Sequence, residues 1–235
     1  MRNSDNDFIF CENCFVKENT GFKHLGKEQI ELLNYEKACN LYKRGDIVYH
    51  EGHKGGGVYC VNKGVLKLYK TGIDGKEQII RFAKPGDLIG FRSVLSDESS
   101  CTTAKVIEDA ILCFIPSKLF VELASKNAEF SMHLIRLSCK ELGESNKYIL
   151  DLAQKTLRER VAEVLLLLFD TFGLDEENYI QVSLTREEVA NIVGTATESV
   201  IRQLSDFKKE GSIDLKGRRI KVLDLEKLKK ISEIF

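Results

Sequence analysis

The chain has 235 residues, of which 43% are hydrophobic and 30% charged, with 17 glycines and 2 prolines. This composition is typical of one or two globular domains and excludes a collagen-like or largely disordered chain. No apolar run is longer than the six residues of Val164–Phe169, far fewer than the roughly 20 residues of a membrane-spanning helix. We expect no secretory leader, no membrane partner and a cytoplasmic location.

The net charge of −1 gives no overall basic field, but the charge is uneven along the chain. Residues 199–221 carry seven Lys and Arg against three Asp and Glu. A basic run of this kind is usually a solvated surface, and it indicates a nucleic-acid contact only beside a suitable motif. The seven cysteines are an odd number, so we expect most of them to be free thiols in a reducing compartment.

Between residues 39 and 116, short runs rich in Val, Ile and Tyr alternate with glycine-containing turns. Strands so short and so closely spaced favour an antiparallel β-roll over a parallel α/β sheet. The segments Asn62–Gly64 and Thr71–Gly75 have the composition of hairpin loops. The expected strands are Ile47–His50, Gly57–Val61, Val65–Tyr69, Gln78–Phe82, Thr103–Ile107 and Ala110–Ile115.

One long helix is predicted from Asn127 to about Leu152. A set of its residues repeats with spacings of three and four, the period of a coiled-coil seam. A second apolar row, which includes Phe130 and Leu134, is expected to face the roll. The first row is either a dimer seam, which we favour, or part of one wide core-facing stripe. Glu141 and Glu144 flank this row and are expected to turn toward solvent. The seam residues are Ile135, Ser138, Leu142, Ser145, Ile149 and Leu152.

The segment 184–211 has the pattern of a helix-turn-helix. Thr185 and Glu188 form a capping-box signature, and Thr195 and Glu198 form a second one. Gly194 permits the left-handed turn between the two helices. The predicted fold class is therefore α+β: a β-roll, a long dimerisation helix and a C-terminal winged helix-turn-helix.

The start of the second helix of this motif suits the major groove of DNA, and the following hairpin suits phosphate contacts. Arg can bind guanine, Glu can accept from cytosine, and Ser or Thr can serve either base. One alternative is a small helical domain with an ordinary basic hairpin. Another is a ligand-binding or metal-sensing module whose helix-turn-helix makes protein contacts. The predicted partner is double-stranded DNA, bound by a homodimer. The candidate contacts are Thr185, Arg186, Thr195, Thr197, Glu198, Ser199, Ile201, Arg202, Lys216, Arg218 and Arg219.

Four segments of the chain resemble the CRP/FNR transcription regulators, and the order of roll, long helix and winged helix-turn-helix matches that family beyond residue 20. The segments are RGDIVYHEG at 44–52, KPGDLIGF at 84–91, CFIP at 113–116 and TREEVANIVGTATESVIRQLSDFKKEG at 185–211. The resemblance implies base reading by Glu198 and Arg202 and contact with RNA polymerase. FNR-type members carry Ser where this chain has Ile201, so the half-site sequence stays open.

The resemblance also locates an effector pocket in the roll, which is similar to a cyclic-nucleotide-binding domain. Family members that bind cyclic nucleotides place a Glu after the glycine that matches Gly90, and an Arg eleven residues after that glycine. Here these positions hold Phe91 and Cys101, so both charged partners of the ligand are missing. We therefore expect no cAMP binding. The candidate pocket residues are Gly90, Phe91, Arg92, Cys101 and Thr102.

FNR-type oxygen sensors have an N-terminal CxxC and a cysteine before Ile-Pro, which match Cys11, Cys14 and Cys113. Their remaining cysteine falls near Thr20, so an iron–sulfur cluster needs a substitute, either Cys39 or Cys60. A redox or iron–sulfur sensor that gates DNA binding through Cys11, Cys14 and Cys113 is thus an alternative reading. Cys39, Cys60, Cys101 and Cys139 are otherwise expected as buried small hydrophobes.

The expected organisation has four parts. They are an arm with the CxxC (1–22), a sensor roll (23–125), a dimerisation helix (126–153) and a winged helix-turn-helix domain (154–235). The sequence has no P-loop, GxSxG or HExxH motif, and its four histidines are scattered, so we expect no enzyme.

Overall fold

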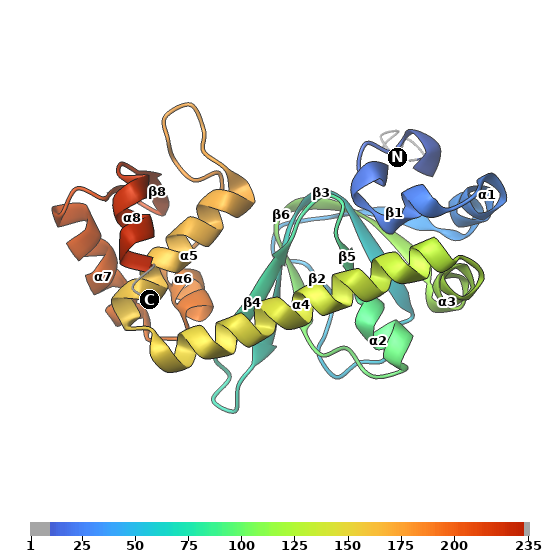
Figure 1. Ribbon diagram of the computed structural model, residues 1–235, viewed down its shortest axis with the longest axis horizontal. Helices are drawn as coiled ribbons and strands as arrows, with labels where there is room; N and C mark the ends of the chain where they lie inside the picture. Colours follow the sequence, from blue (N-terminus) through green and yellow to red (C-terminus); the bar gives the residue numbers. More distant parts are fainter. Residues whose placement is uncertain (1–9, 233–235) are drawn as a thin grey trace, which may run out of the picture. The chain divides into compact units, whose positions relative to one another are not determined.

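The computed structural model describes residues 10–232, which form two compact units. Within the described residues, the N-terminal unit holds residues 10–70 and 80–142, and the C-terminal unit holds residues 71–79 and 143–232. Part of the expected N-terminal arm, residues 1–9, lies outside the described residues. Figure 1 gives the element labels used below.

The N-terminal unit is built on one antiparallel sheet, as predicted, with strand order β1-β6-β3-β4. Strand β2 also pairs with β6, and β5 pairs with β3. The long strands β3 and β6 run side by side over most of their length. The strands are β1 (Ala38–Tyr42), β2 (Ile47–Tyr49), β3 (Gly57–Thr71), β4 (Glu77–Ala83), β5 (Leu88–Ile89) and β6 (Thr103–Pro116).

Two features of the predicted strand pattern are wrong. Asn62–Gly64 is no hairpin loop, because it lies inside β3, where the register against β6 shifts around Lys63. The two strands expected on either side of it are therefore one long strand. In the same way, Thr103–Ile107 and Ala110–Ile115 are parts of the single strand β6. A bulge and a loop both favour glycine and polar residues, so the composition did not separate them.

Helices cover the sheet and close the core of the N-terminal unit. The rings of Phe22 and Phe120 both contact Phe130 on α4, with centroids 5.7 and 5.6 Å apart. These residues belong to an apolar cluster between the helices and the sheet, and a second cluster fills the roll. The helical segments are η1 (Cys11–Asn13), η2 (Lys17–Asn19), η3 (Gly21–His24), α1 (Lys27–Glu36), α2 (Phe91–Ser96), α3 (Ser117–Lys126) and α4 (Ala128–Gln154).

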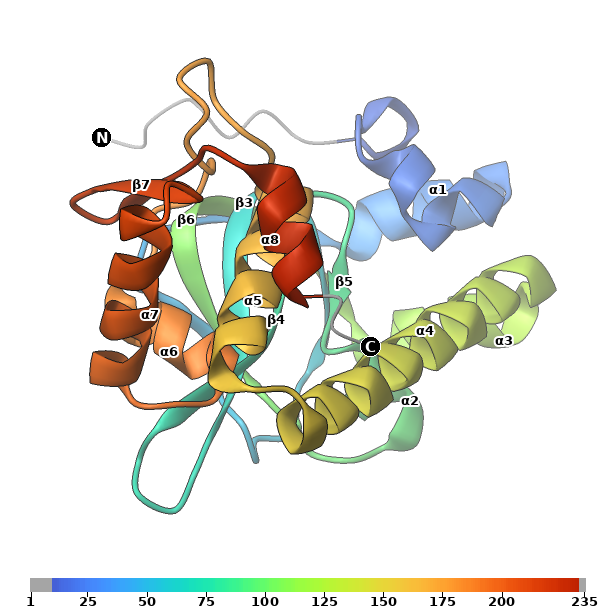
Figure 2. The same cartoon turned by 60° about the vertical axis from the view of Figure 1, so that its left-hand side comes forward.

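The C-terminal unit is a small helical domain with a two-stranded hairpin (Figure 2). Helix α8 packs on α5, and α6 packs on α7. The apolar face of α5, with Val161, Leu165 and Leu168 almost fully buried, supplies the centre of this core. Its elements are α5 (Leu157–Phe172), α6 (Arg186–Val193), α7 (Thr197–Lys209), β7 (Ile213–Lys216), β8 (Arg219–Val222) and α8 (Leu225–Ser232).

Gly64 provides a test of the packing between β3 and β6. Its φ is +86°, and an added Cβ would lie 2.4 Å from the carbonyl oxygen of Asp109. Gly64→Ala should lower the free energy of unfolding by about 2–5 kcal/mol, since backbone strain and overpacking combine. Gly75, with φ +74° and open space around it, is the matched control.

Gly75→Ala should cost only the backbone term, roughly 1–2 kcal/mol. Urea denaturation followed by circular dichroism measures both variants. Equal losses of stability at the two glycines would contradict the register shift at Lys63 and the close approach of β6.

Candidate DNA-binding and effector sites

The first helix of the helix-turn-helix, α6, begins with the predicted capping box. The backbone N–H of Thr185 donates to the Glu188 carboxylate at 2.9 Å, and the Glu188 N–H donates to Thr185 Oγ1 at 3.0 Å. The helix ends at Gly194, whose φ of +74° makes the left-handed turn. These local bonds fix where α6 begins and ends, and so where the next helix can begin.

The second predicted capping box is wrong. Helix α7 begins at Thr197, its N-cap residue is Ala196, and no side chain caps it. Thr195 lies before the cap, and its N–H bonds to the carbonyl of Ala190 in the turn. Because the helix starts later than predicted, Glu198 falls in its first turn, one position short of the capping-box site, and is exposed.

Helix α7 buries one face and leaves the other open. Val200, Leu204 and Phe207 are fully buried on the inner face. On the outer face Glu198, Ile201 and Arg202 are exposed, while Thr197 and Ser199 are partly buried near the N-terminal end. The helix thus presents an acceptor, a cation and hydroxyls where a recognition helix meets base edges.

The hairpin β7–β8 forms the predicted wing, with Lys216 and Arg218 exposed at its turn. Arg219 differs from them, because it pairs with Asp175 and its guanidinium lies 4.0 Å from the ring centroid of Tyr179. Arg186, at the start of α6, donates to the carbonyl of Gly217 at 2.8 Å. Arg186 and Arg219 therefore also hold the wing in place.

Residues 71–79, at the tip of the β3–β4 hairpin, belong to the C-terminal unit. Lys76 Nζ donates to the carbonyl of Thr195 at 2.6 Å, and Gln78 Nε2 donates to the carbonyl of Asn191 at 2.5 Å. These bonds satisfy carbonyls at the turn between α6 and α7. Sequence reasoning did not find them, because no local pattern marks a contact over more than 110 residues.

Helix α4 exposes large apolar side chains along the predicted seam. Ile135, Leu142 and Ile149 are 53, 62 and 64% exposed, and they repeat every seven residues. The opposite row, Phe130 and Leu134, is buried in the core of the N-terminal unit. Two rows with different environments argue against one wide core-facing stripe.

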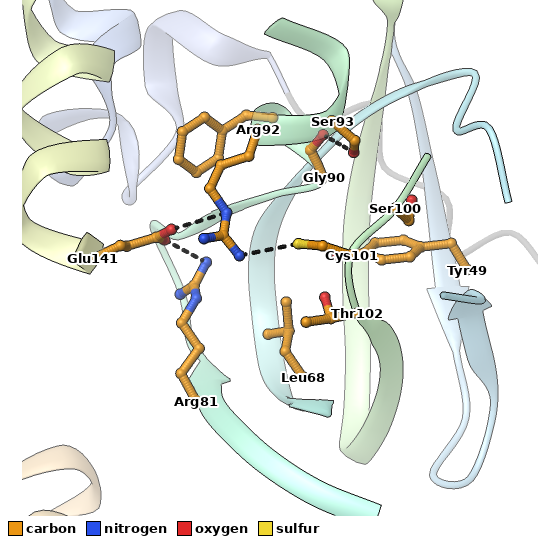
Figure 3. A pocket seen from close by; sticks show the side chains of 11 residues that line it. Tyr49, Leu68, Arg81, Gly90, Arg92, Ser93, Ser100, Cys101, Thr102 and Glu141 are labelled. Carbon is orange, nitrogen blue, oxygen red and sulfur yellow. Dashed lines mark hydrogen bonds and ion pairs between the residues drawn. The ribbon is translucent and has the colours of Figure 1, made fainter. Parts of the chain in front are cut away.

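The expected effector pocket is a small cavity in the N-terminal unit (Figure 3). The residues that line this cavity include Gly90, Phe91, Arg92, Cys101 and Thr102, which we proposed as pocket residues, and also residues that sequence reasoning missed. The most important of the missed residues are Tyr49, Arg81 and Glu141.

Glu141 overturns one expectation. It was predicted to turn toward solvent, but it is only 9% exposed, whereas Glu144 is exposed as predicted. The Glu141 carboxylate lies 3.1 Å from Arg81 Nη2 and 3.4 Å from Arg92 Nε. Arg92 Nη2 also lies 3.2 Å from Cys101 Sγ. Burial raises the pKa of Tyr49 to about 12, so its hydroxyl stays protonated near this ion cluster.

The cysteines do not have the arrangement of an iron–sulfur cluster. Cys11, Cys14, Cys60 and Cys113 line one cavity, but in residues 10–232 no group of three or more His, Cys, Asp or Glu side chains is placed to hold a metal ion. Cys11 Sγ accepts from Lys37 Nζ at 2.8 Å. Burial raises the pKa of the Cys11 and Cys60 thiols and so favours their protonated form.

The expectation of buried, free cysteines is only partly right. Cys60 is buried, but Cys101 and Cys139 are exposed, and Cys39 forms a disulfide with Cys113. These two cysteines are direct partners in the β1–β6 pairing, 74 residues apart in sequence. Without the strand pairing, the sequence offered no reason to join them.

Two protein-family models match separate parts of this chain. Residues 40–127 match the cyclic nucleotide-binding domain family, and residues 159–231 match the Crp-like helix-turn-helix domain family. The transcriptional activator protein Anr of Pseudomonas protegens is 30% identical over 217 residues, which cover 91% of this chain and 88% of that protein. The anaerobic regulatory protein of Haemophilus influenzae is 26% identical over 224 residues, covering 94% of this chain and 86% of that protein.

Among solved structures, FixK2 from Bradyrhizobium japonicum has a TM-score of 0.76 and 25% identity, covering 85% of this chain and 98% of that one. A β-roll of the cyclic nucleotide-binding type and a winged helix-turn-helix on one chain define a sequence-specific DNA-binding transcription regulator. This chain belongs to the CRP/FNR family of these regulators. No helix within residues 10–232 has the length and apolar character needed to cross a membrane.

Arg202 and Arg218 allow a matched test of base contacts, expected for Arg202, and phosphate contacts, expected for Arg218. Arg202→Ala should cost roughly 1–3 kcal/mol of binding free energy and relax specificity at one base pair. Arg218→Ala should weaken binding to all sequences alike and reduce the salt slope by about one. Fluorescence anisotropy on specific and scrambled duplexes, over a range of salt concentrations, measures both effects. If Arg202→Ala weakened both duplexes equally, base reading by Arg202 would be wrong.

Proposed function

We propose that the protein acts in the cytoplasm as a homodimer that reads a near-palindromic DNA site and regulates transcription through contact with RNA polymerase. The observation that carries the proposal is the exposed apolar row of α4. The same chain has one recognition helix, α7, whose outer face is the one we expect to contact base edges. One reading face covers one half-site, so a palindrome needs two copies of the chain.

The composition of the seam supports a dimer that forms without an effector. The predicted positions comprise four large apolar residues and two serines, and none carries a charge. Burying each large side chain is worth about 1.5–3 kcal/mol, which outweighs the cost of the serines. In a dimer paired along α4, two copies of α7 would enter successive major grooves about 34 Å apart.

In this proposal each expected segment of the chain has a separate function. Residues 23–125 would sense, 126–153 would pair, and 154–235 would bind DNA. The exposed Lys216 and Arg218 suit the phosphate backbone, while Glu198, Ile201 and Arg202 suit the base edges. The likeness of this chain to FixK2 in fold and to Anr in sequence, over most of its length, supports the assignment.

Selection from random-sequence DNA tests the proposed site. The purified full-length protein should enrich an inverted repeat whose half-sites are one helical turn apart. A matched pool in high salt controls for non-specific binding, which weakens steeply with salt. Failure to enrich any inverted repeat would overturn the proposed site.

Leu142→Glu tests the seam. Placing two carboxylates across the dimer axis should convert the dimer to a 26.7 kDa monomer and abolish operator binding. Sedimentation in air at micromolar concentration, without effector, measures the mass, and the unchanged protein should sediment as a dimer. Leu150→Glu is the control, because Leu150 is 51% exposed but lies outside the predicted seam. Equal masses for both variants would contradict pairing along this row.

A further inference from the structure

The cavity of the N-terminal unit contains a carboxylate held by two guanidiniums. Glu141 of α4 lies between Arg81 of β4 and Arg92 of α2, at 3.1 and 3.4 Å (Figure 3). The Glu141 side chain is 10% exposed, whereas that of Arg92 is 45% exposed. The carboxylate is thus inside the protein, and one of its partners borders solvent.

A buried ion cluster of this kind contributes little to folding. Removing charges from water is costly, and apolar replacements of buried ion pairs are often as stable or more stable. Stability therefore does not explain why the chain keeps this ion cluster. Charge clusters in a cavity are frequent at functional sites, so we consider a binding role for this one.

The cavity is suited to the oxygens of an anion. Ser100 and Thr102 are buried beside it, and Tyr49 lines it as well. Hydroxyls and guanidiniums are donors for carboxylate and phosphate oxygens, and Arg binds both groups in a bidentate manner. The only acidic residue among those that line the cavity is Glu141.

We propose that Arg81 and Arg92 form a binding site for a small oxyanion, a carboxylate or phosphate group, and that the Glu141 carboxylate occupies this site in the absence of the ligand. The free volume is about 20 Å³, room for one water molecule. The ligand must therefore replace the Glu141 carboxylate and cannot bind beside it.

Arg81 keeps its place when Glu141 leaves, because its guanidinium also donates to the carbonyl of Leu88 at 3.2 Å and lies 3.8 Å from Asp87. Arg92 is more exposed and marks the side from which a ligand enters. Displaced Glu141 lies next to Leu142 on α4, so binding would change the surroundings of the seam. This last consequence rests on the proposed dimer, whereas the site itself does not.

Glu141→Gln tests whether the Glu141 carboxylate competes with the ligand for Arg81 and Arg92, because glutamine keeps the shape of the side chain but removes its charge. Calorimetric titration of the full-length protein uses inorganic phosphate, acetate and succinate at constant ionic strength. The variant should bind at least one of them at one site per chain, at least tenfold more tightly than the unchanged protein. The probe that binds best shows whether phosphate or carboxylate is preferred. Glu144→Gln, an exposed position on the same helix, should titrate like the unchanged protein.

Arginine replacements locate the site. Adding Arg81→Met or Arg92→Met to Glu141→Gln should weaken the binding at least tenfold, with circular dichroism showing that each variant is folded. Arg92 is half-exposed, so its replacement serves even if the Arg81 variant does not fold. The proposal is overturned if Glu141→Gln binds no more tightly than the unchanged protein. It is equally overturned if binding survives the arginine replacements, which would place the anion elsewhere, such as on the basic wing. Because no DNA is present, these outcomes are independent of the proposed DNA site.

Discussion

Helix α4 has more apolar surface than residues 10–232 bury, and the proposed pairing of two chains depends on this imbalance. On one side, Phe130 and Leu134 are almost completely buried and join the aromatic contacts that close the N-terminal unit. On another side, Ile135, Leu142 and Ile149 remain exposed. Exposure of a regular apolar row to water is unfavourable, and this is the reason we propose a second copy of the helix as its partner. The same helix carries Glu141 into the cavity of the N-terminal unit, one residue before Leu142 of the exposed row.

The DNA-binding unit depends on a different set of interactions, most of them local. The capping box at Thr185 and the left-handed Gly194 fix the start and end of α6. The buried face of α7 then leaves its other face to the solvent. Arg186 and Arg219 are held by the wing and by Asp175, so the outermost cations are Lys216 and Arg218 at its turn. The proposed DNA contacts thus place base reading and phosphate binding on separate side chains of one small domain.

Sequence reasoning succeeded where the signal is local. The spacing of apolar residues predicted the long helix and its two rows, and Thr185 with Glu188 predicted the start of α6. It failed where the partner is far along the chain. Glu141 lies 60 residues from Arg81, and nothing around either residue indicates the pairing. The disulfide between Cys39 and Cys113 depends on the β1–β6 register, which only the folded sheet reveals. The prediction of a second capping box failed for another reason. The N–H of Thr195 bonds within the turn, and α7 begins at Thr197, two residues after Thr195.

The central claim is that two copies of this chain read DNA as a symmetric pair. Hydroxyl-radical footprinting on a selected site tests it most directly, because it maps protein contact along each strand. The account predicts two protected patches of equal strength, about one helical turn apart and related by a two-fold axis. A single patch that covers one half-site, at protein concentrations that saturate the DNA, would contradict it.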